Sequence, residues 1–280
     1  MKKRFVYYAS LLSLMLLFTT IATTEAQIIG NKQVKDETRA LAGNFHTIIS
    51  NGSVDVILTQ DPETKIVVRA DANLIPLVTT QVKDDVLTIG VKRNSWFTAK
   101  TMKVFVSAPH IQKIQSQGSG DIDIKPTFVE AAMNISIRGS GDLTANLQTK
   151  NLVLQVRGSG DAQISGIQGE LQLSLTGSGD IDARNLQLQS CAIKSAGSGD
   201  ITLEGKTAQL TIVSAGSGDL DASDLVSVVV NATNAGSGDI KVHPIQKLQV
   251  SLAGSGNLTY LGKPDILKTK SAGSGEIRRR

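Results

Sequence analysis

The chain has 280 residues, with 29 Lys and Arg, 25 Asp and Glu, and a formal net charge of +4. Its one cysteine excludes an intrachain disulfide, and with it the class of small disulfide-stapled secreted domains. Without residues 1–26 the formal charge falls to +2, because three basic residues and Glu25 are lost, so this composition does not predict a nucleic-acid partner.

Residues 1–26 have the layout of a secretory signal peptide. A basic cluster at residues 2–4 precedes an apolar run from Phe5 to about Ile21, and small residues end at Ala26. An uncleaved membrane anchor is the alternative, although polar residues interrupt the run, and no later segment could span a bilayer as a helix. We therefore expect an exported protein in the periplasm, at the outer-membrane surface or outside the cell, with no transmembrane segment after cleavage.

Residues 27–117 precede the regular part of the sequence. Residues 27–43 are polar and show no sustained period, which predicts a flexible leader or linker. Residues 44–117 hold short segments of alternating β-branched residues, which predict a β-rich N-terminal cap with the first turns of a repeat structure. Within them, Val78–Val82 and Val86–Ile89 flank an acidic turn and indicate a hairpin.

Residues 118–280 contain nine copies of Gly-Ser-Gly, in steps of 18 to 21 residues. Apolar and polar residues alternate after each copy and again before the next, so each repeat holds at least two short strands. Turn-forming residues mark a second corner between them: Asn146, Gly166, Asn185, Gly205, Asp224, Pro244 and Gly262. The pattern predicts an all-β fold, a single-stranded parallel β-helix or β-solenoid with rungs of 19–20 residues.

An acidic or amide residue follows every Gly-Ser-Gly. These residues are Asp121, Asp142, Asp161, Asp180, Asp200, Asp219, Asp239, Asn257 and Glu276. We expect a structural role, in which each side chain accepts hydrogen bonds from backbone N–H groups of its own corner. Calcium binding is the alternative, but the spacing differs from the nine-residue calcium-binding repeat, so we expect no metal or other cofactor.

An aromatic pair, Trp96 and Phe97, lies in an irregular stretch between Lys92, Arg93 and Lys100. We expect these rings to pack onto the cap, because apolar rings usually find cover. Contact with a glycan, a peptide or a lipid headgroup is the alternative.

Two arginines, Arg138 and Arg157, directly precede Gly-Ser-Gly in adjacent repeats and should stack on the outer face. We expect surface ion pairs with Asp142 or Asp161, which contribute little to stability. The alternative is a clamp on the carboxylates of acidic sugars.

Two features of the interior can also be predicted. Cys191 occupies an inward column and should be a buried, inert thiol. Ser195, Ser214, Asn234 and Ser271 replace apolar residues in another inward column, and we expect them to form hydrogen bonds along the solenoid axis.

The segments Val54–Leu58 and Val86–Ile89, followed by serial Gly-Ser-Gly-Asp-[Ile/Leu], resemble a known family over roughly residues 43–277. It is the family of secreted putative adhesins with a head GIN domain of Bacteroidota, also called DUF2807. The resemblance implies a right-handed parallel β-helix-like fold. It implies no established enzymatic activity, and it supplies no catalytic residue.

We therefore expect a non-enzymatic β-solenoid of the cell envelope, a secreted or periplasmic module for adhesion or ligand binding rather than a self-exporting adhesin. Its partner would be a glycan or another envelope component. A polysaccharide-acting enzyme of lyase or hydrolase type is the alternative, but it needs a local cluster of acids and bases that breaks the repeat. A structural assembly protein, forming homo-oligomers through the solenoid end near Glu276, is the third possibility.

Overall fold

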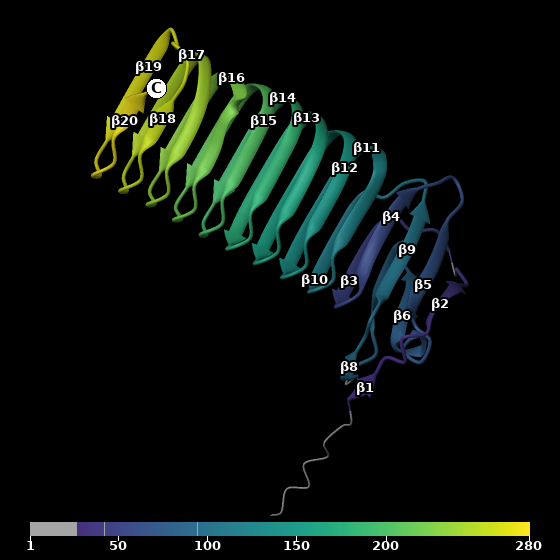
Figure 1. Ribbon diagram of the computed structural model, residues 1–280. Helices are drawn as coiled ribbons and strands as arrows, with labels where there is room; N and C mark the ends of the chain where they lie inside the picture. Colours follow the sequence, from purple (N-terminus) through teal and green to yellow (C-terminus); the bar gives the residue numbers. More distant parts are fainter. Residues whose placement is uncertain (1–26, 42, 94) are drawn as a thin grey trace, which may run out of the picture.

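The computed structural model describes residues 27–41, 43–93 and 95–280. The predicted signal peptide, residues 1–26, lies outside this part of the chain. An 18-stranded sheet winds into a solenoid of about 9 turns, as Figure 1 shows, and the predicted all-β solenoid is confirmed. No helix of the described residues is long and apolar enough to cross a bilayer.

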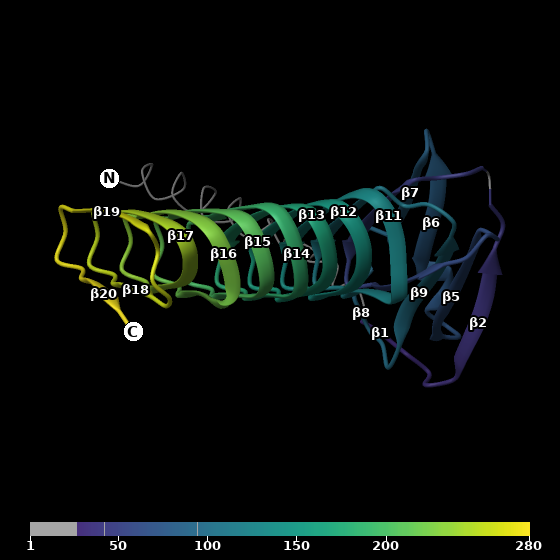
Figure 2. The ribbon, with the colours of Figure 1, turned by 90° about the horizontal axis from the view of Figure 1, so that it is seen from above.

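Seven long strands form the body of the solenoid. They are β11 (Ile122–Gly139), β12 (Leu143–Gly158), β13 (Ala162–Gly177), β14 (Ile181–Ser195), β15 (Ile201–Ser214), β16 (Leu220–Asn234) and β17 (Ile240–Leu252). Each pairs in parallel with the next, and Figure 2 shows the resulting stack of coils from above. We call each turn a rung, and we divide its strand into a first half, before the second corner, and a second half, before the next Gly-Ser-Gly.

The core is a set of apolar columns that run along the solenoid axis. Ile135, Leu154, Leu173 and Ile193 are register neighbours in four successive rungs, and all are at most 2% exposed. Polar residues between them point outward, as period-two alternation predicts. The repeat pattern therefore becomes a continuous buried core.

The second corner interrupts every long strand where the turn-forming residues occur. The register shifts there, for instance between Ser165 and Glu170. Gly166, Asn185, Gly205 and Gly262 have positive φ angles, which glycine and asparagine adopt at low cost. The predicted second corner is confirmed at these positions.

The N-terminal region begins the solenoid and closes its first edge. β3 (Thr47–Gly52) and β4 (Asp55–Gln60) form the first rung, on which β10 (Lys113–Gly118) and the start of β11 stack. On the other side of this rung, β7 (Val86–Val91) pairs in parallel with β3, and β9 (Met102–Ala108) pairs in parallel with β4. β6 (Val78–Lys83) and β5 (Lys65–Asp71) then add in antiparallel fashion, and a short 3-10 helix, Ile75–Leu77, connects them. The predicted hairpin, β6–β7, is confirmed.

The prediction of a flexible leader at residues 27–43 was wrong. β1 (Ile28–Ile29) pairs with β8 (Phe97–Thr98), and β2 (Val34–Arg39) is an antiparallel partner of β5. β2 shows no hydrophobic period because nearly all of its side chains are exposed. Its order comes from backbone pairing and from two hydrogen bonds of 2.7 Å that Arg69 donates to Asp36, none of which periodicity can reveal.

The C-terminal end of the solenoid is built from three short strands. They are β18 (Leu258–Tyr260), β19 (Ile266–Ser271) and β20 (Ile277–Arg279). β19 stacks on β17, and β20 stacks on β18 as the start of a further rung, so the parallel register continues to this end.

Candidate binding sites

The Gly-Ser-Gly corner is a place of close contact between rungs. Gly139 has a φ of 133°, and a Cβ atom there would overlap the backbone carbonyl of Gly118 in the preceding rung. The N–H of Ser140 donates to the same carbonyl oxygen at 2.9 Å. Glycine therefore provides both the backbone angle and the space for the strands to stack.

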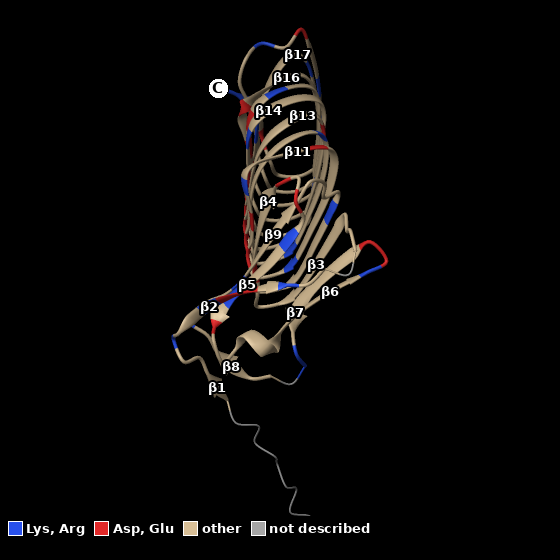
Figure 3. Cartoon of the chain, turned by 90° about the vertical axis from the view of Figure 1, so that its right-hand side faces the viewer, with Lys and Arg blue, Asp and Glu red and all other residues tan. Residues whose placement is uncertain are grey.

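The acidic residues after the corners form a hydrogen-bonded ladder, the Asp ladder. The N–H of each member donates to the side-chain oxygen of the equivalent residue in the preceding rung, for example Asp180 to Asp161 at 2.8 Å. The hydrogen-bonded members of the Asp ladder are Asp121, Asp142, Asp161, Asp180, Asp200, Asp219, Asp239, Asn257 and Glu276. Figure 3 shows acidic residues along one edge of the solenoid.

The Asp ladder differs from our expectation in the donor of each hydrogen bond, and it includes one residue more than the sequence predicted. The donor is the next rung's N–H and not an N–H of the same corner, because in-register stacking places equivalent residues side by side. Asp55 also belongs to the ladder, since its Oδ1 accepts the N–H of Asp121 at 3.2 Å. The sequence held a signal for it in Gly52-Ser53-Val54-Asp55, a corner with one glycine replaced. No group of three or more potential metal ligands occurs among the described residues.

Arg138 and Arg157 are register neighbours and both are exposed. Neither forms an ion pair with Asp142, Asp161 or any other acidic residue that the structure describes, so the expected surface pairing was wrong. The two arginines lie on the second half of their rungs, whereas the acids lie beyond the corner. Two unpaired guanidinium groups are therefore held side by side.

The polar inward column forms hydrogen bonds within corners instead of along the axis. The Nδ2 of Asn234 donates to the carbonyl of Gly238 at 2.8 Å, and Ser271 makes the equivalent contact with Gly275 at 3.3 Å. Ser195 and Ser214 are buried in the same column. The expectation of axial hydrogen bonds was wrong for Asn234 and Ser271, because each reaches its own corner carbonyl.

Cys191 is 1% exposed, as expected. Burial disfavours the thiolate and raises the pKa of Cys191 to about 12. The thiol is therefore unsuited to nucleophilic or redox chemistry in the folded protein.

The aromatic pair at residues 96 and 97 is divided between core and solvent. Phe97 packs partly buried against the core, as expected, but Trp96 is 69% exposed and does not pack onto the cap. The backbone explains the difference: β8 pairs with β1, and the carbonyl of Trp96 accepts the N–H of Ile28 at 2.8 Å. Successive side chains of an extended segment point to opposite sides, so Phe97 faces inward and Trp96 outward.

Trp96 lines an open groove of about 550 Å³, which we call the Trp96 groove. Its lining residues are Gly52, Ser53, Val91, Lys92, Ser95, Trp96 and Phe97. The exposed side chains of Lys92, Arg93 and Lys100 lie near it in the sequence and form no ion pair within the described chain. The groove thus combines an exposed indole with uncompensated positive charge.

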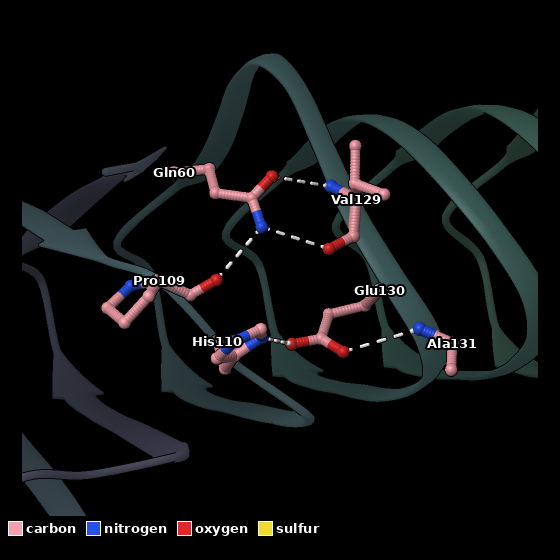
Figure 4. A network of polar contacts seen from close by, with 6 residues as sticks. All are labelled: Gln60, Pro109, His110, Val129, Glu130 and Ala131. Atoms are coloured by element: carbon pink, nitrogen blue, oxygen red, sulfur yellow. Dashed lines mark hydrogen bonds and ion pairs between the residues drawn. The ribbon is translucent and has the colours of Figure 1, made fainter. Parts of the chain in front are cut away.

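A polar clamp joins the N-terminal cap to the first long strand, and sequence reasoning missed it (Figure 4). The Nε2 of Gln60 donates to the carbonyls of Val129 and Pro109 at 3.0 and 2.9 Å, and its Oε1 accepts the N–H of Val129 at 2.9 Å. A side-chain amide that binds both backbone groups of one residue imitates a paired strand. We interpret this contact as structural.

Beside this clamp, His110 contacts Glu130 through Nδ1 and Oε1 at 3.0 Å. The Glu130 side chain is only 9% exposed, and its Oε2 accepts the N–H of Ala131 at 3.3 Å. The one available signal was spacing, because the step from Gly118 to Gly139 is 21 residues, the longest in the series. The extra residues lie between Ile124 and Phe128, where the register shifts, directly before the part of β11 that carries Glu130.

Comparison with known proteins agrees with this architecture. A family model described as "putative auto-transporter adhesin, head GIN domain" matches residues 44–203 and 189–264. A solved structure from Parabacteroides distasonis, described as a putative lipid binding protein, is 26% identical with a TM-score of 0.67. That match covers 91% of this chain and 100% of the other.

Two further solved structures are described as putative adhesins. One, from Parabacteroides distasonis, is 21% identical with a TM-score of 0.64, and the match covers 91% of this chain and 100% of that one. The other, from Bacteroides fragilis, is 22% identical with a TM-score of 0.51, and the match covers 90% and 100%. At these identities the two structures show a shared fold alone. No match was found among curated proteins.

Proposed function

Because the chain belongs to the family of the putative auto-transporter adhesin head GIN domain, we propose that it is an exported, non-enzymatic binding module of the cell envelope. The observation that carries this proposal is Trp96, which is 69% exposed beside an open groove of about 550 Å³. The groove lies in the N-terminal cap, where the repeat pattern is absent. Tryptophan is enriched among the residues that contribute most of the binding energy at interfaces.

The Trp96 groove suits a glycan. An indole offers a flat apolar face together with an N–H donor, and Lys92 and Ser95 add polar groups beside it. Such a mixture of one aromatic surface and a few polar groups is typical of small-ligand sites. We therefore propose an envelope glycan as the ligand of this groove.

A lipid headgroup is the second candidate, favoured by one specific observation. Ile29, in the strand paired with β8, is 70% exposed, so two large apolar side chains and several cations occur together near the groove. Aromatic and basic residues in this combination are found where proteins meet membrane interfaces. The relative with 26% identity is named as a putative lipid binding protein.

Two other functions are less well supported. A polysaccharide-acting enzyme would need free acids at a break in the repeat, but Asp123 and Asp182 are each ion-paired with a neighbouring cation, Lys125 and Arg184. An assembly protein would use the solenoid end near Glu276. The family and the solved relatives are described as adhesins or binding proteins.

Binding to a glycan array and to lipid vesicles tests the proposal, with Trp96→Ala as the variant. We expect at least a tenfold loss of binding for Trp96→Ala. Ile245→Ala, at a 47% exposed apolar position on the solenoid, should bind as the parent protein does. Binding of an uncharged glycan that survives Trp96→Ala would contradict the site. Release of reducing sugars that is lost in the Asp123→Asn/Asp182→Asn variant would show an enzyme instead.

A further inference from the structure

Three neighbouring outward columns of the solenoid carry no acidic residue. We define the basic face as the three outward columns of the second half of the rungs that are in register with Lys113, Gln115 and Gln117, from β10 to β19. It carries six cations: Lys113, Arg138, Arg157, Lys194, Lys268 and Lys270. All its other residues are Gln, Asn, Ser, Thr, Ala or Val. The charge of the basic face is therefore entirely positive.

The cations of this face differ from those on the first half of the long strands. None of the six forms an ion pair with an acid of the described chain. On the first half of the long strands, cations are paired, as in Lys125 with Asp123 and Lys241 with Asp221. The acids nearest to the face are Glu170, at the outward position that adjoins Gln172 in β13, and the Asp ladder beyond the corner. The basic face thus differs from the rest of the solenoid in that its columns hold several unpaired cations and no acid.

Arg138 and Arg157 show how close these charges are. They are register neighbours in adjacent strands, which are about 4.8 Å apart in a sheet. Like charges directly opposite each other destabilise a sheet, unless an anion lies between them. Guanidinium groups are suited to this task, because each can donate two parallel hydrogen bonds to a carboxylate or a sulfate.

The same face offers grooves and neutral polar groups. A shallow groove of about 190 Å³ lies between Gln155, Gln172, Ser174 and Lys194. A second one, of about 310 Å³, includes Lys268 and Lys270, and most of its other lining residues have amide or hydroxyl side chains. Amide and hydroxyl groups both donate and accept hydrogen bonds, as sugar hydroxyls require.

We infer that the basic face binds an anionic polysaccharide, carboxylated or sulfated, that lies across several rungs. The cations would neutralise the acidic groups of the polymer, and the amides and hydroxyls would bind its hydroxyl groups. The face carries no aromatic residue, whereas binding of single-stranded nucleic acid relies on aromatic stacking. It also lacks the large apolar side chains that enter a membrane interface.

The inference does not rest on the Trp96 groove, which lies on the N-terminal cap. Its test uses the purified protein with polygalacturonate, dextran sulfate and uncharged dextran as probes. The test variant is Arg138→Gln/Arg157→Gln/Lys194→Gln. The matched control, Lys65→Gln/Lys206→Gln/Lys263→Gln, removes the same charge from exposed, unpaired positions outside the face.

We expect the parent protein to bind polygalacturonate or dextran sulfate and not dextran. The test variant should bind at least tenfold more weakly and with a shallower salt dependence, while the control variant stays within twofold of the parent. Tighter binding to polygalacturonate would indicate that the face prefers carboxylate groups, and tighter binding to dextran sulfate would indicate that it prefers sulfate groups. The inference is overturned if the control variant loses as much binding as the test variant. Tighter binding to double-stranded DNA or to anionic vesicles than to either polymer would also overturn it.

Discussion

The backbone N–H of Asp142 donates to the Oδ1 of Asp121 at 2.9 Å, across one rung of the solenoid. The same contact recurs from Asp55 to Glu276. A charged acceptor makes a stronger hydrogen bond than a neutral one, and exposure to water lowers the repulsion between neighbouring carboxylates. The Asp ladder is thus a side-chain extension of the parallel sheet.

Removal of one acceptor from the middle of the Asp ladder should weaken the stack locally. In Asp161→Ala the N–H of Asp180 loses its partner, which we expect to lower the free energy of unfolding by about 1 kcal/mol. Asp161→Asn keeps an acceptor oxygen and should change the free energy of unfolding by less than about 0.5 kcal/mol. Asn257 already acts as such an acceptor in the ladder, for the N–H of Glu276. Urea unfolding of both variants measures the difference.

The effect of calcium on the melting temperature distinguishes a purely structural Asp ladder from one that also binds calcium. If the carboxylates serve only as backbone acceptors, addition of calcium should leave the melting temperature of the parent protein unchanged. An increase of several degrees, absent in Asp161→Asn, would show that the ladder also binds the ion.

The corner glycines should tolerate no side chain. Gly158 has a φ of 138°, and a Cβ atom there would overlap the carbonyl of Gly139. We expect Gly158→Ala to lower the free energy of unfolding by about 2–4 kcal/mol, through strain and displacement of the neighbouring rung. The matched control is Ser159→Ala, at the exposed next position of the same corner, which should change stability by less than about 0.5 kcal/mol. Equal loss in both variants would contradict the close-contact explanation.

The fold could be predicted from the sequence because the solenoid has one-dimensional order. Each rung contacts only its neighbours, so a period near 20 residues and an alternation of two specify both the stack and its core. Ile135, Leu154 and Leu173 are assigned to the same buried column by counting residues from the nearest Gly-Ser-Gly. The cap has no such repeat, and β2 has no buried face that a pattern could reveal.

The candidate sites depend on relationships between rungs, which spacing describes only in part. Spacing predicts that Arg138 and Arg157 are neighbours, but not that their side chains lack acidic partners. It also could not predict that Trp96 is exposed, because this depends on the pairing of β8 with β1. The clamp formed by Gln60 joins positions 69 residues apart and leaves no periodic trace.

The thiol of Cys191 should be unreactive until the solenoid opens. It is 1% exposed, and its pKa of about 12 leaves very little thiolate at pH 8. We expect no reaction with a thiol-specific chromogenic reagent over several hours at pH 8, and complete reaction in 8 M urea. Fast labelling of the folded protein would show that rungs β14 and β15 open readily. The labelling rate at intermediate urea would then report local unfolding.

Stability should depend on pH through Asp221. Partial burial raises the pKa of this carboxyl, but hydrogen bonds from Ser223 and Lys241 outweigh burial and hold the pKa below its ordinary value. Because the pKa is lower in the folded state, the contribution of Asp221 is present above the unfolded pKa of about 3.9 and is lost as pH falls through the folded pKa.

Lys241→Met removes the 3.0 Å ion pair and should therefore raise the pKa of Asp221 towards its ordinary value. The acid-dependent loss of stability below about pH 4 should become smaller in this variant. Carboxyl NMR titration measures the pKa, and urea unfolding between pH 2.5 and 6 measures the stability. Lys206→Met removes an exposed cation that has no ion pair in the described chain, and it should leave both measurements unchanged. An unaltered Asp221 pKa in Lys241→Met would show that Ser223 alone holds the carboxylate.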